Sequence, residues 1–351
     1  MSNPSASVGV RLEGVTKSFG DTAVLKGIDL AMAPGTLTTL LGPSGCGKTT
    51  ILRLVAGLEM PTTGRILIGD EDVSLLSASH RDVAMVFQSY ALFPHMTVGE
   101  NVSYGLKVQG VGKEERHARA EAAMASVGLA GYGGRYIDQL SGGQQQRIAV
   151  ARALILEPKV MLFDEPLSNL DSKLRRQMRE DIRRLQQDTG ITSVYVTHDQ
   201  EEALSVSDEV VVISEGAIAQ KGTPKHLYRR PVSPFVATFM GDANITTGRV
   251  RDLDGVMVVE IDGLRVPIED AEGLAGERQV ALRPESLNLK DIGPGLRGTV
   301  RSHAYVGAAT EYWVQWGDHE LFAIMPASTR EFPVGAQVYV DIDPVGVAVI
   351  G

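Results

Sequence analysis

Cysteine is nearly absent from this 351-residue sequence, in which Cys46 is the only one. An intrachain disulfide is therefore excluded, no zinc-type spacing of Cys and His occurs, and the composition fits a reducing cytoplasm. The first residues, MSNPSASVGV, lack the basic stretch and the apolar core of a signal peptide. No apolar run approaches the roughly 18 residues that indicate a membrane span. We therefore expect any contact with a membrane to be made through a partner protein.

Positive charge is also scarce. The chain has 34 Lys and Arg against 43 Asp and Glu, which gives a formal net charge of −9. Residues 244–351 hold 9 of the basic and 16 of the acidic side chains, so most of the excess negative charge lies there. Surfaces that bind nucleic acid are normally basic, because they neutralise phosphates. We therefore expect no nucleic-acid partner.

Length and pattern together predict two domains, 1–243 and 244–351. In the first, short β-branched runs alternate with helical stretches, which is typical of an α/β domain with a parallel sheet covered by helices. The second reads as strands and turns, with hairpin signals at 254–255 and 317–318, and it predicts a small all-β barrel or sandwich. The strands predicted in the first domain are 38–41, 160–163, 194–197 and 210–213.

Apolar residues at helical spacing follow the first of these strands. They are Ile51, Leu54, Val55 and Leu58. Gly57 can end the helix that they predict, since glycine readily adopts the left-handed conformation of a C-terminal cap. A last short helix is predicted to run through Met240.

The motif with the most specific chemistry is GPSGCGKT at residues 42–49, which matches G-x-x-x-x-G-K-[ST] between a predicted strand and a predicted helix. Its glycines let main-chain N–H groups turn toward phosphate oxygens, and the helix N-terminus adds positive potential. Lys48 is expected to reach the β- and γ-phosphates, and the Thr49 hydroxyl is expected to bind Mg²⁺. A glycine-rich turn without a ligand is the alternative, but chance matches in this context are rare. The predicted nucleotide contacts are Gly42, Pro43, Ser44, Gly45, Cys46, Gly47, Lys48, Thr49 and Thr50.

Two neighbouring carboxylates follow a buried strand in VMLFDEP. Successive side chains on a strand point in different directions, so the two can take different roles. Asp164 is placed to hold Mg²⁺, and Glu165 is placed to polarise the attacking water as a general base. A strand that simply leaves the core is the alternative, which the phosphate loop upstream disfavours.

Residues 140–144, LSGGQ, lead into the helical stretch QQQRIAVARALILE. Ser141 can cap the helix, and Gly142 and Gly143 would expose main-chain N–H groups that form a second anion site. A capped helix after a loop is the alternative, and the residues by themselves do not choose between the two.

LSGGQ resembles the signature of ATP-binding-cassette (ABC) ATPases, whose other motifs follow in the expected order across residues 19–199. The resemblance implies a phosphate-loop NTPase cassette with a helical signature subdomain. It also implies a head-to-tail homodimer, in which the signature of one subunit closes over the ATP bound to the phosphate loop of the other. The contacts implied from the partner subunit are Ser141, Gly142, Gly143, Gln144 and Asp171.

The same resemblance implies further roles. Phe19 is similar to the aromatic residue that stacks on adenine, and His198 resembles the switch histidine that contacts the γ-phosphate. Gln88 resembles the glutamine that touches Mg²⁺ and the attacking water, and it begins a segment, through His95, that senses the membrane subunit. Residues 168–171 are similar to a loop exchanged across the dimer. The implied catalytic set is Lys48, Gln88, Glu165 and His198, and the implied metal ligands are Thr49, Gln88 and Asp164.

The β domain predicted at residues 244–351 indicates which type of ABC transporter the resemblance implies. Residues 281–285, ALRPE, resemble the hallmark of the oligonucleotide-fold (OB-fold) regulatory domains that many bacterial importer ATPases carry. An acidic surface repels nucleic-acid phosphates, so a regulatory or dimer-stabilising role is expected. The stretch VFQSYALFPHMTVGENVSYGL most resembles spermidine/putrescine importers, which predicts polyamine uptake. Ferric iron and 2-aminoethylphosphonate are the alternative cargoes.

An importer ATPase implies specific partners and a location. The expected partners are a second copy of the chain, two transmembrane permease subunits and, through these, a periplasmic or extracellular solute-binding protein. The chain is then expected to be a peripheral protein on the cytoplasmic face of the inner membrane. A soluble non-transport ABC ATPase is the alternative class, but this chain has neither paired cassettes nor a basic arm. A non-catalytic module would have lost Glu165 or His198, and an exporter is disfavoured by the β domain.

Overall fold

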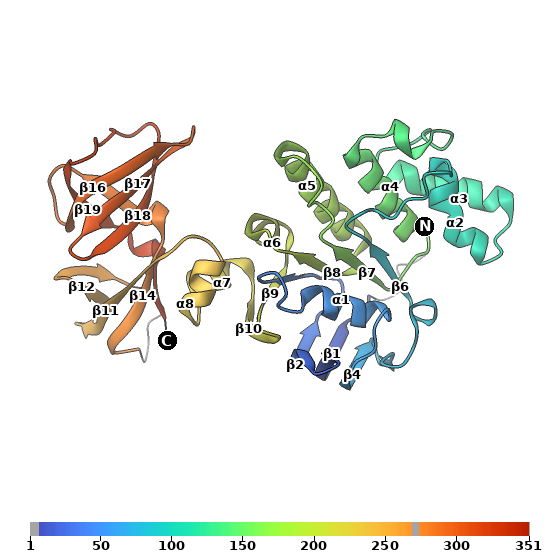
Figure 1. Ribbon diagram of the computed structural model, residues 1–351, viewed down its shortest axis with the longest axis horizontal. Helices are drawn as coiled ribbons and strands as arrows, with labels where there is room; N and C mark the ends of the chain where they lie inside the picture. Colours follow the sequence, from blue (N-terminus) through green and yellow to red (C-terminus); the bar gives the residue numbers. More distant parts are fainter. Residues whose placement is uncertain (1–6, 269–273, 351) are drawn as a thin grey trace. The chain divides into compact units, whose positions relative to one another are not determined.

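A computed structural model of the protein describes residues 7–268 and 274–350. The first six residues, part of the segment predicted to contain no signal peptide, lie outside the described residues. The chain divides into two compact units, Met1–Pro224 and Lys225–Gly351 (Figure 1). Within the described ranges, no helix has both the length and the apolar character that a membrane crossing requires.

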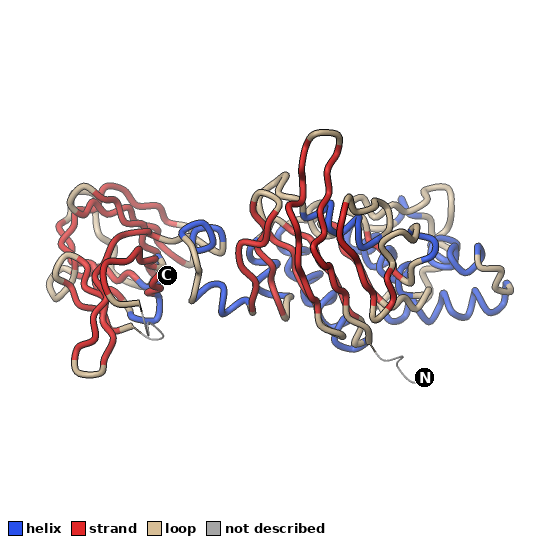
Figure 2. Tube along the Cα trace, turned by 90° about the horizontal axis from the view of Figure 1, so that it is seen from below, coloured by secondary structure: helices blue, strands red, loops and turns tan. Residues whose placement is uncertain are grey.

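The larger sheet of the first unit has six strands in the order β10-β9-β3-β8-β7-β6. Strands are drawn in red in Figure 2. All of them are parallel except β10, which pairs with β9 in the antiparallel sense. The four predicted strands are confirmed as β3, β7, β8 and β9. The bounds are β3 (Leu37–Leu41), β6 (Val83–Val86), β7 (Val160–Asp164), β8 (Thr192–Thr197), β9 (Glu209–Ser214) and β10 (Ala217–Gly222).

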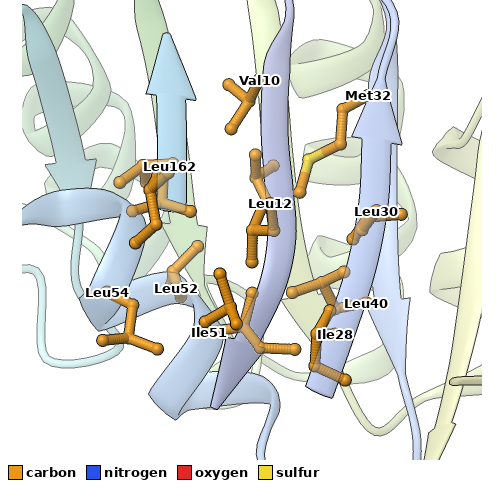
Figure 3. Close-up of a cluster of buried hydrophobic side chains, with 14 of the residues drawn as sticks. Val10, Leu12, Ile28, Leu30, Met32, Leu40, Ile51, Leu52, Leu54 and Leu162 are labelled. Carbon is orange, nitrogen blue, oxygen red and sulfur yellow. The ribbon is translucent and has the colours of Figure 1, made fainter. Parts of the chain in front are cut away.

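A second sheet of the first unit was not predicted. It is antiparallel, in the order β2-β1-β4-β5. Apolar side chains of β1 and β2 pack with those of the parallel sheet and of the helix α1 in one core (Figure 3). The bounds are β1 (Val10–Phe19), β2 (Thr22–Met32), β4 (Thr63–Ile68), β5 (Glu71–Asp72) and α1 (Lys48–Ala56).

Helix α1 begins directly after the phosphate-loop motif. Its Ile51, Leu54 and Val55 are fully buried, as the helical spacing predicted. Gly57 caps the helix with a φ of 72°, which is the predicted end. The prediction that Leu58 belongs to the apolar face was wrong, because Leu58 lies beyond the cap and is 45% exposed.

Helix α1 packs on one face of the parallel sheet, and helices α4 and α5 cover the opposite face. On that opposite face, the two helices bury Met161, Phe163 and Tyr195. Helices α2, α3 and α4 also form an apolar cluster of their own, which is the predicted helical subdomain. The bounds are α2 (Val98–Val108), α3 (Lys113–Ser126), α4 (Gly142–Leu154), α5 (Ser172–Thr189) and α6 (Gln200–Val206).

The second unit contains two five-stranded antiparallel sheets that share one apolar core, so the predicted all-β domain is confirmed. Both predicted hairpins are present, since residues 254–255 join β11 to β12 and residues 317–318 join β17 to β18. The first sheet contains β11 (Asn244–Leu253), β12 (Val256–Ile261), β13 (Leu264–Pro267), β14 (Gly276–Leu282) and β20 (Val347–Ile350). The second contains β15 (Leu287–Lys290), β16 (Leu296–Tyr305), β17 (Ala309–Trp316), β18 (His319–Pro326) and β19 (Gln337–Ile342).

Arg283, in the ALRPE segment, attaches two short helices to this β domain. Its guanidinium is buried and donates to four main-chain carbonyl oxygens, those of Tyr228, Ala237, Gly241 and Asp242. Burial lowers the pKa of Arg283, and these carbonyl dipoles compensate the buried charge. The helices α7 (Pro224–Arg229) and α8 (Pro234–Phe239) therefore pack with the second unit, whose start precedes the predicted domain boundary at 243/244.

Candidate ATP-hydrolysis site

The phosphate loop connects the buried strand β3 to α1 and leaves no room for side chains at two of its glycines. A Cβ atom on Gly42 would lie 2.2 Å from the carbonyl oxygen of Ile213, and one on Gly47 would lie 2.6 Å from Leu25 Cδ2. Gly47 also has a φ of 108°, a conformation that side chains disfavour. The motif therefore needs Gly42 and Gly47 for packing, in addition to the predicted main-chain contacts to phosphate.

Lys48 is buried and folds back along this loop. Its Nζ donates to the carbonyl oxygens of Gly42 at 2.7 Å and Pro43 at 2.9 Å, and lies 3.8 Å from Cys46 Sγ. These two carbonyl oxygens satisfy donors of the buried ammonium group and hold it beside the loop. The cation therefore lies within the loop that the sequence predicts to bind the phosphates.

Asp164 stands at the end of β7, and its carboxyl is near enough to Thr49 of α1 for the two side chains to interact. Burial raises the pKa of the Asp164 carboxyl, and the neighbouring Glu165 adds to the rise, whereas Arg53 and the Thr49 side chain oppose it. Mg²⁺ bound with a nucleotide is usually held by one or two protein oxygens together with phosphates and water. The predicted pair of Asp164 and Thr49 fits this chemistry, and a bound cation would offset the charge that burial makes costly.

No group of three or more His, Cys, Asp and Glu side chains in the described parts of the chain is arranged to hold a metal ion by itself. Mg²⁺ at a phosphate loop does not need such a group, because the nucleotide supplies part of its oxygen shell.

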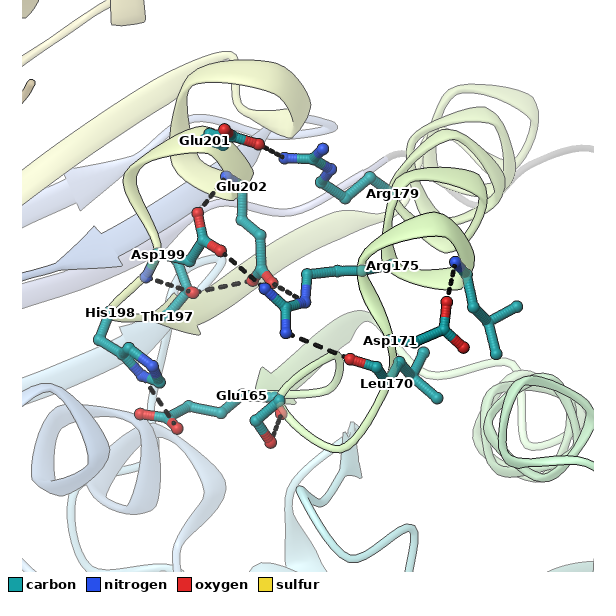
Figure 4. Close-up of polar contacts among 12 residues, drawn as sticks. Glu165, Leu170, Asp171, Arg175, Arg179, Thr197, His198, Asp199, Glu201 and Glu202 are labelled. Carbon is teal, nitrogen blue, oxygen red and sulfur yellow. Dashed lines mark hydrogen bonds and ion pairs between the residues drawn. The ribbon is translucent and has the colours of Figure 1, made fainter. Parts of the chain in front are cut away.

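Glu165 and His198 contact each other, although 33 positions separate them in the sequence. The Nδ1 atom of His198 lies 3.2 Å from Oε2 of Glu165 (Figure 4). Glu165 has a φ of 43°, which is uncommon for a residue with a side chain, and its N–H donates to the carbonyl oxygen of Val196. Parallel pairing of β7 with β8 brings the loops that follow these two strands together. The predicted base and the predicted switch histidine are therefore neighbours in space.

Gln88 belongs to the same group of loops. Its Nε2 donates to Ser168 Oγ at 3.1 Å, and Asn169 Nδ2 donates to the carbonyl oxygen of Gln88 at 3.0 Å. Ser168 Oγ also donates to the carbonyl oxygen of Glu165 at 3.1 Å. The segment that begins at Gln88 is therefore joined by hydrogen bonds to the loop that begins at Glu165.

The signature residues form a capping box at the start of α4. Ser141 Oγ accepts from the N–H of Gln144, and Gln144 Oε1 accepts from the N–H of Ser141 at 2.9 Å. A Cβ atom on Gly143 would lie 2.9 Å from Leu174 Cδ1 of α5. Gly143 thus allows α4 to approach α5 closely, a packing role that the sequence did not reveal. Asp171 accepts from the N–H of Leu174 and caps α5.

Phe19 ends β1 with 47% of its surface exposed, and Lys17 Nζ lies 4.6 Å from the centre of its ring. An exposed ring of this kind can stack on a base, as predicted.

The phosphate loop, the carboxylates after β7 and the capped signature helix occur in a known family. The sequence pattern of the ABC transporter family matches residues 25–168, and that of the TOBE domain matches residues 280–350. The "Fe(3+) ions import ATP-binding protein FbpC" of Brucella abortus is 53% identical over 97% of both chains. This chain belongs to the ABC transporter family. A protein of the same description from Escherichia coli K12 is 52% identical over 97% of both chains.

A solved ABC structure has the same cassette fold. The ATP-binding cassette MJ0796, a dimer in a post-hydrolysis state bound to ADP and Pi, matches with a TM-score of 0.55 and 32% identity. The match covers 61% of this chain and 98% of that one. The predicted α/β cassette with an appended β domain is therefore confirmed, and this ABC ATPase binds ATP with Mg²⁺ and hydrolyses it.

One residue of this ABC ATPase that the sequence did not point to is Arg152 on α4. It donates to the carbonyl oxygens of Tyr90 at 2.9 Å and Ala91 at 2.7 Å, two residues with positive φ. Asn101 of α2 donates to the carbonyl oxygen of Phe93 and accepts from its N–H. The segment after Gln88 is thus held in an unusual conformation by two helices of the helical subdomain. Sequence patterns do not reveal such a contact, because Arg152 resembles any exposed arginine on a helix.

Alkylation of Cys46 is expected to abolish ATP binding by this ABC ATPase. The thiol is buried within the phosphate loop, and a Cβ atom on Gly42 would lie only 2.6 Å from Cys46 Sγ, so a bulky group must displace the loop. Binding of a fluorescent ATP analogue before and after N-ethylmaleimide treatment measures the effect, and ATP present during treatment should protect the thiol. The Cys46→Ser variant should lose no further binding on treatment. Normal ATP hydrolysis by fully alkylated protein would contradict the steric argument.

Proposed function

We propose that the chain is the ATP-hydrolysing motor subunit of a bacterial importer and that the cargo of this importer is ferric iron. The observation that carries the proposal is the 53% identity to a ferric-iron import ATP-binding protein over 97% of both chains, second unit included. Several relatives of the same description, from Brucella, Escherichia and Haemophilus, support it. They favour the ferric-iron alternative over the polyamine prediction.

The motor works by binding ATP between two copies of the chain. Lys48 and the main-chain N–H groups of the phosphate loop hold the phosphates, and Thr49 and Asp164 would hold Mg²⁺, which would neutralise part of the phosphate charge. Glu165 accepts a proton from the attacking water, and His198 and Gln88 lie beside it to orient the γ-phosphate and the water. The remaining contacts come from Ser141, Gly142, Gly143, Gln144 and Asp171 of the partner subunit.

Loss of the γ-phosphate then reopens the dimer, because phosphate contacts bridge the two copies. The segment that Arg152 and Asn101 hold, at the start of the helical subdomain, is the part that contacts the permease. Two permease subunits and a solute-binding protein complete the importer, and the chain is peripheral on the cytoplasmic face of the inner membrane. The β domain stabilises or regulates the dimer.

Uptake of radioactive ferric iron by cells that lack and then regain this chain tests the cargo. Restored uptake with the native chain, and none with the Glu165→Gln variant, is the expected result. Uptake of labelled putrescine and of 2-aminoethylphosphonate is measured in the same cells. A requirement of this chain for either of these, with iron uptake unchanged, would contradict the ferric-iron proposal and leave the motor function intact.

A further inference from the structure

A buried carboxyl group contacts the strand end that precedes His198, the predicted switch histidine. Glu202 of α6 is only 3% exposed, and its Oε2 accepts from the hydroxyls of Thr197 at 2.8 Å and Tyr195 at 3.0 Å. Thr197 Oγ1 also accepts from the N–H of Asp199 at 3.0 Å. The strand end that precedes His198 is therefore held by hydrogen bonds to Glu202 and by the bond between Asp199 N–H and Thr197.

Arg175 of α5 joins this group to the loop that follows Glu165. Its Nη1 donates to Asp199 Oδ2 at 3.3 Å, and its Nε lies 3.9 Å from Glu202 Oε1. Its Nη2 donates to the carbonyl oxygen of Leu170 at 3.2 Å. Figure 4 shows the guanidinium between the two carboxylates and the main chain at Leu170. One planar group thus connects three elements, namely α5, the loop after β7 and the loop after β8.

The two loops that Arg175 joins carry the catalytic contact at their other ends. Glu165 begins the loop that reaches Leu170, and His198 directly precedes Asp199. The 3.2 Å contact between Glu165 and His198 depends on how these loops lie relative to each other. Glu165 needs such support because its positive φ is intrinsically disfavoured. We propose that Arg175 is a positioning residue, which holds Glu165 and His198 in the arrangement that hydrolysis requires.

Arginine suits this position for a chemical reason. Its guanidinium presents several N–H donors in a rigid plane, so it donates to the carbonyl oxygen of Leu170 and to Asp199 at fixed angles while Nε, which has no hydrogen-bond partner among the described residues, faces Glu202. A lysine ammonium keeps the charge but cannot reproduce this geometry. The inference rests on the proposed roles of Glu165 and His198. It predicts that the rate of ATP hydrolysis requires arginine at position 175 and that a positive charge alone is not sufficient.

The test measures ATP hydrolysis and ATP binding separately in the full-length chain. Arg175→Ala and Arg175→Lys are expected to lower kcat on the order of tenfold to a hundredfold, as misplaced catalytic groups do. The Kd for a fluorescent ATP analogue should stay within about twofold, because the phosphate loop is untouched. Arg179→Ala is the matched control. Arg179 lies one turn along α5 and pairs with Glu201 of α6 at 3.3 Å, but it binds neither loop, so both quantities should stay as in the native chain.

A double variant shows whether Arg175 acts through Glu165. When Glu165→Gln is already present, adding Arg175→Ala should slow hydrolysis by no more than about twofold, because the function that Arg175 supports is gone. Unchanged kcat in both Arg175 variants, with Glu165→Gln inactive, would overturn this inference alone. Loss of ATP binding in both would also overturn it, since that result indicates a structural role. Normal turnover by Glu165→Gln would instead refute the proposed catalytic assignment.

Discussion

Replacing Glu165 by glutamine is expected to slow ATP hydrolysis by a factor on the order of 10² to 10⁴, which is the usual contribution of a general base. Glutamine has nearly the shape of glutamate but cannot accept the proton of the attacking water. ATP binding should persist, because Lys48 and the phosphate loop are unaltered. Since the bound γ-phosphate is then not removed, the variant should accumulate as a closed dimer with Mg²⁺ and ATP. Phosphate release and size-exclusion chromatography measure the two effects.

Glu201→Gln is the matched control for this substitution. Glu201 lies close in sequence to His198, but its side chain is 83% exposed and pairs with Arg179 at 3.3 Å. The same chemical change there should leave both hydrolysis and the oligomeric state as in the native chain. Near-normal turnover by Glu165→Gln would remove Glu165 from the role of general base.

The parallel sheet could be predicted from the sequence because its strands are continuous apolar runs. Strand β3 is buried at every position and β7 at all but the last, which is the pattern of strands covered on both faces. The antiparallel sheet was missed for a physical reason. In β1, the register shifts near Gly14, so that the buried positions run Val10, Leu12 and then Val15. Such a bulge breaks the alternation by which a strand with one buried face is predicted.

The candidate site was predicted to the extent that it consists of local motifs. The phosphate loop, Asp164 and Ser141 each stand beside a helix or strand end that the sequence also predicts. The contact of Glu165 with His198 had no such signal, because it depends on a positive φ and on strand pairing. Arg175 was missed because its partners are spread over the chain, and their proximity follows only from the packing of α5 against α6.

Placing a negative charge at residue 141 is expected to abolish hydrolysis while sparing ATP binding by the single chain. Ser141→Asp keeps the capping interaction of α4, because aspartate is as good an N-cap as serine. In the proposed dimer, however, the new carboxylate faces the γ-phosphate bound to the partner subunit, and like charges in contact cost several kcal/mol. Hydrolysis should therefore fall on the order of a hundredfold or more. Phosphate release measures this fall, and binding of a fluorescent ATP analogue measures the affinity of the single chain.

Ser141→Asn separates charge from shape in this experiment. Asparagine is nearly the same size as aspartate and is also a good N-cap, but it is neutral and its amide can donate a hydrogen bond to phosphate. It should therefore retain much more activity than Ser141→Asp. Equal loss in both variants would mean that the hydroxyl itself, or the local packing of α4, matters more than the charge. Loss of ATP binding by the single chain in Ser141→Asp would contradict the head-to-tail arrangement, because residue 141 would then act on the nucleotide of its own chain.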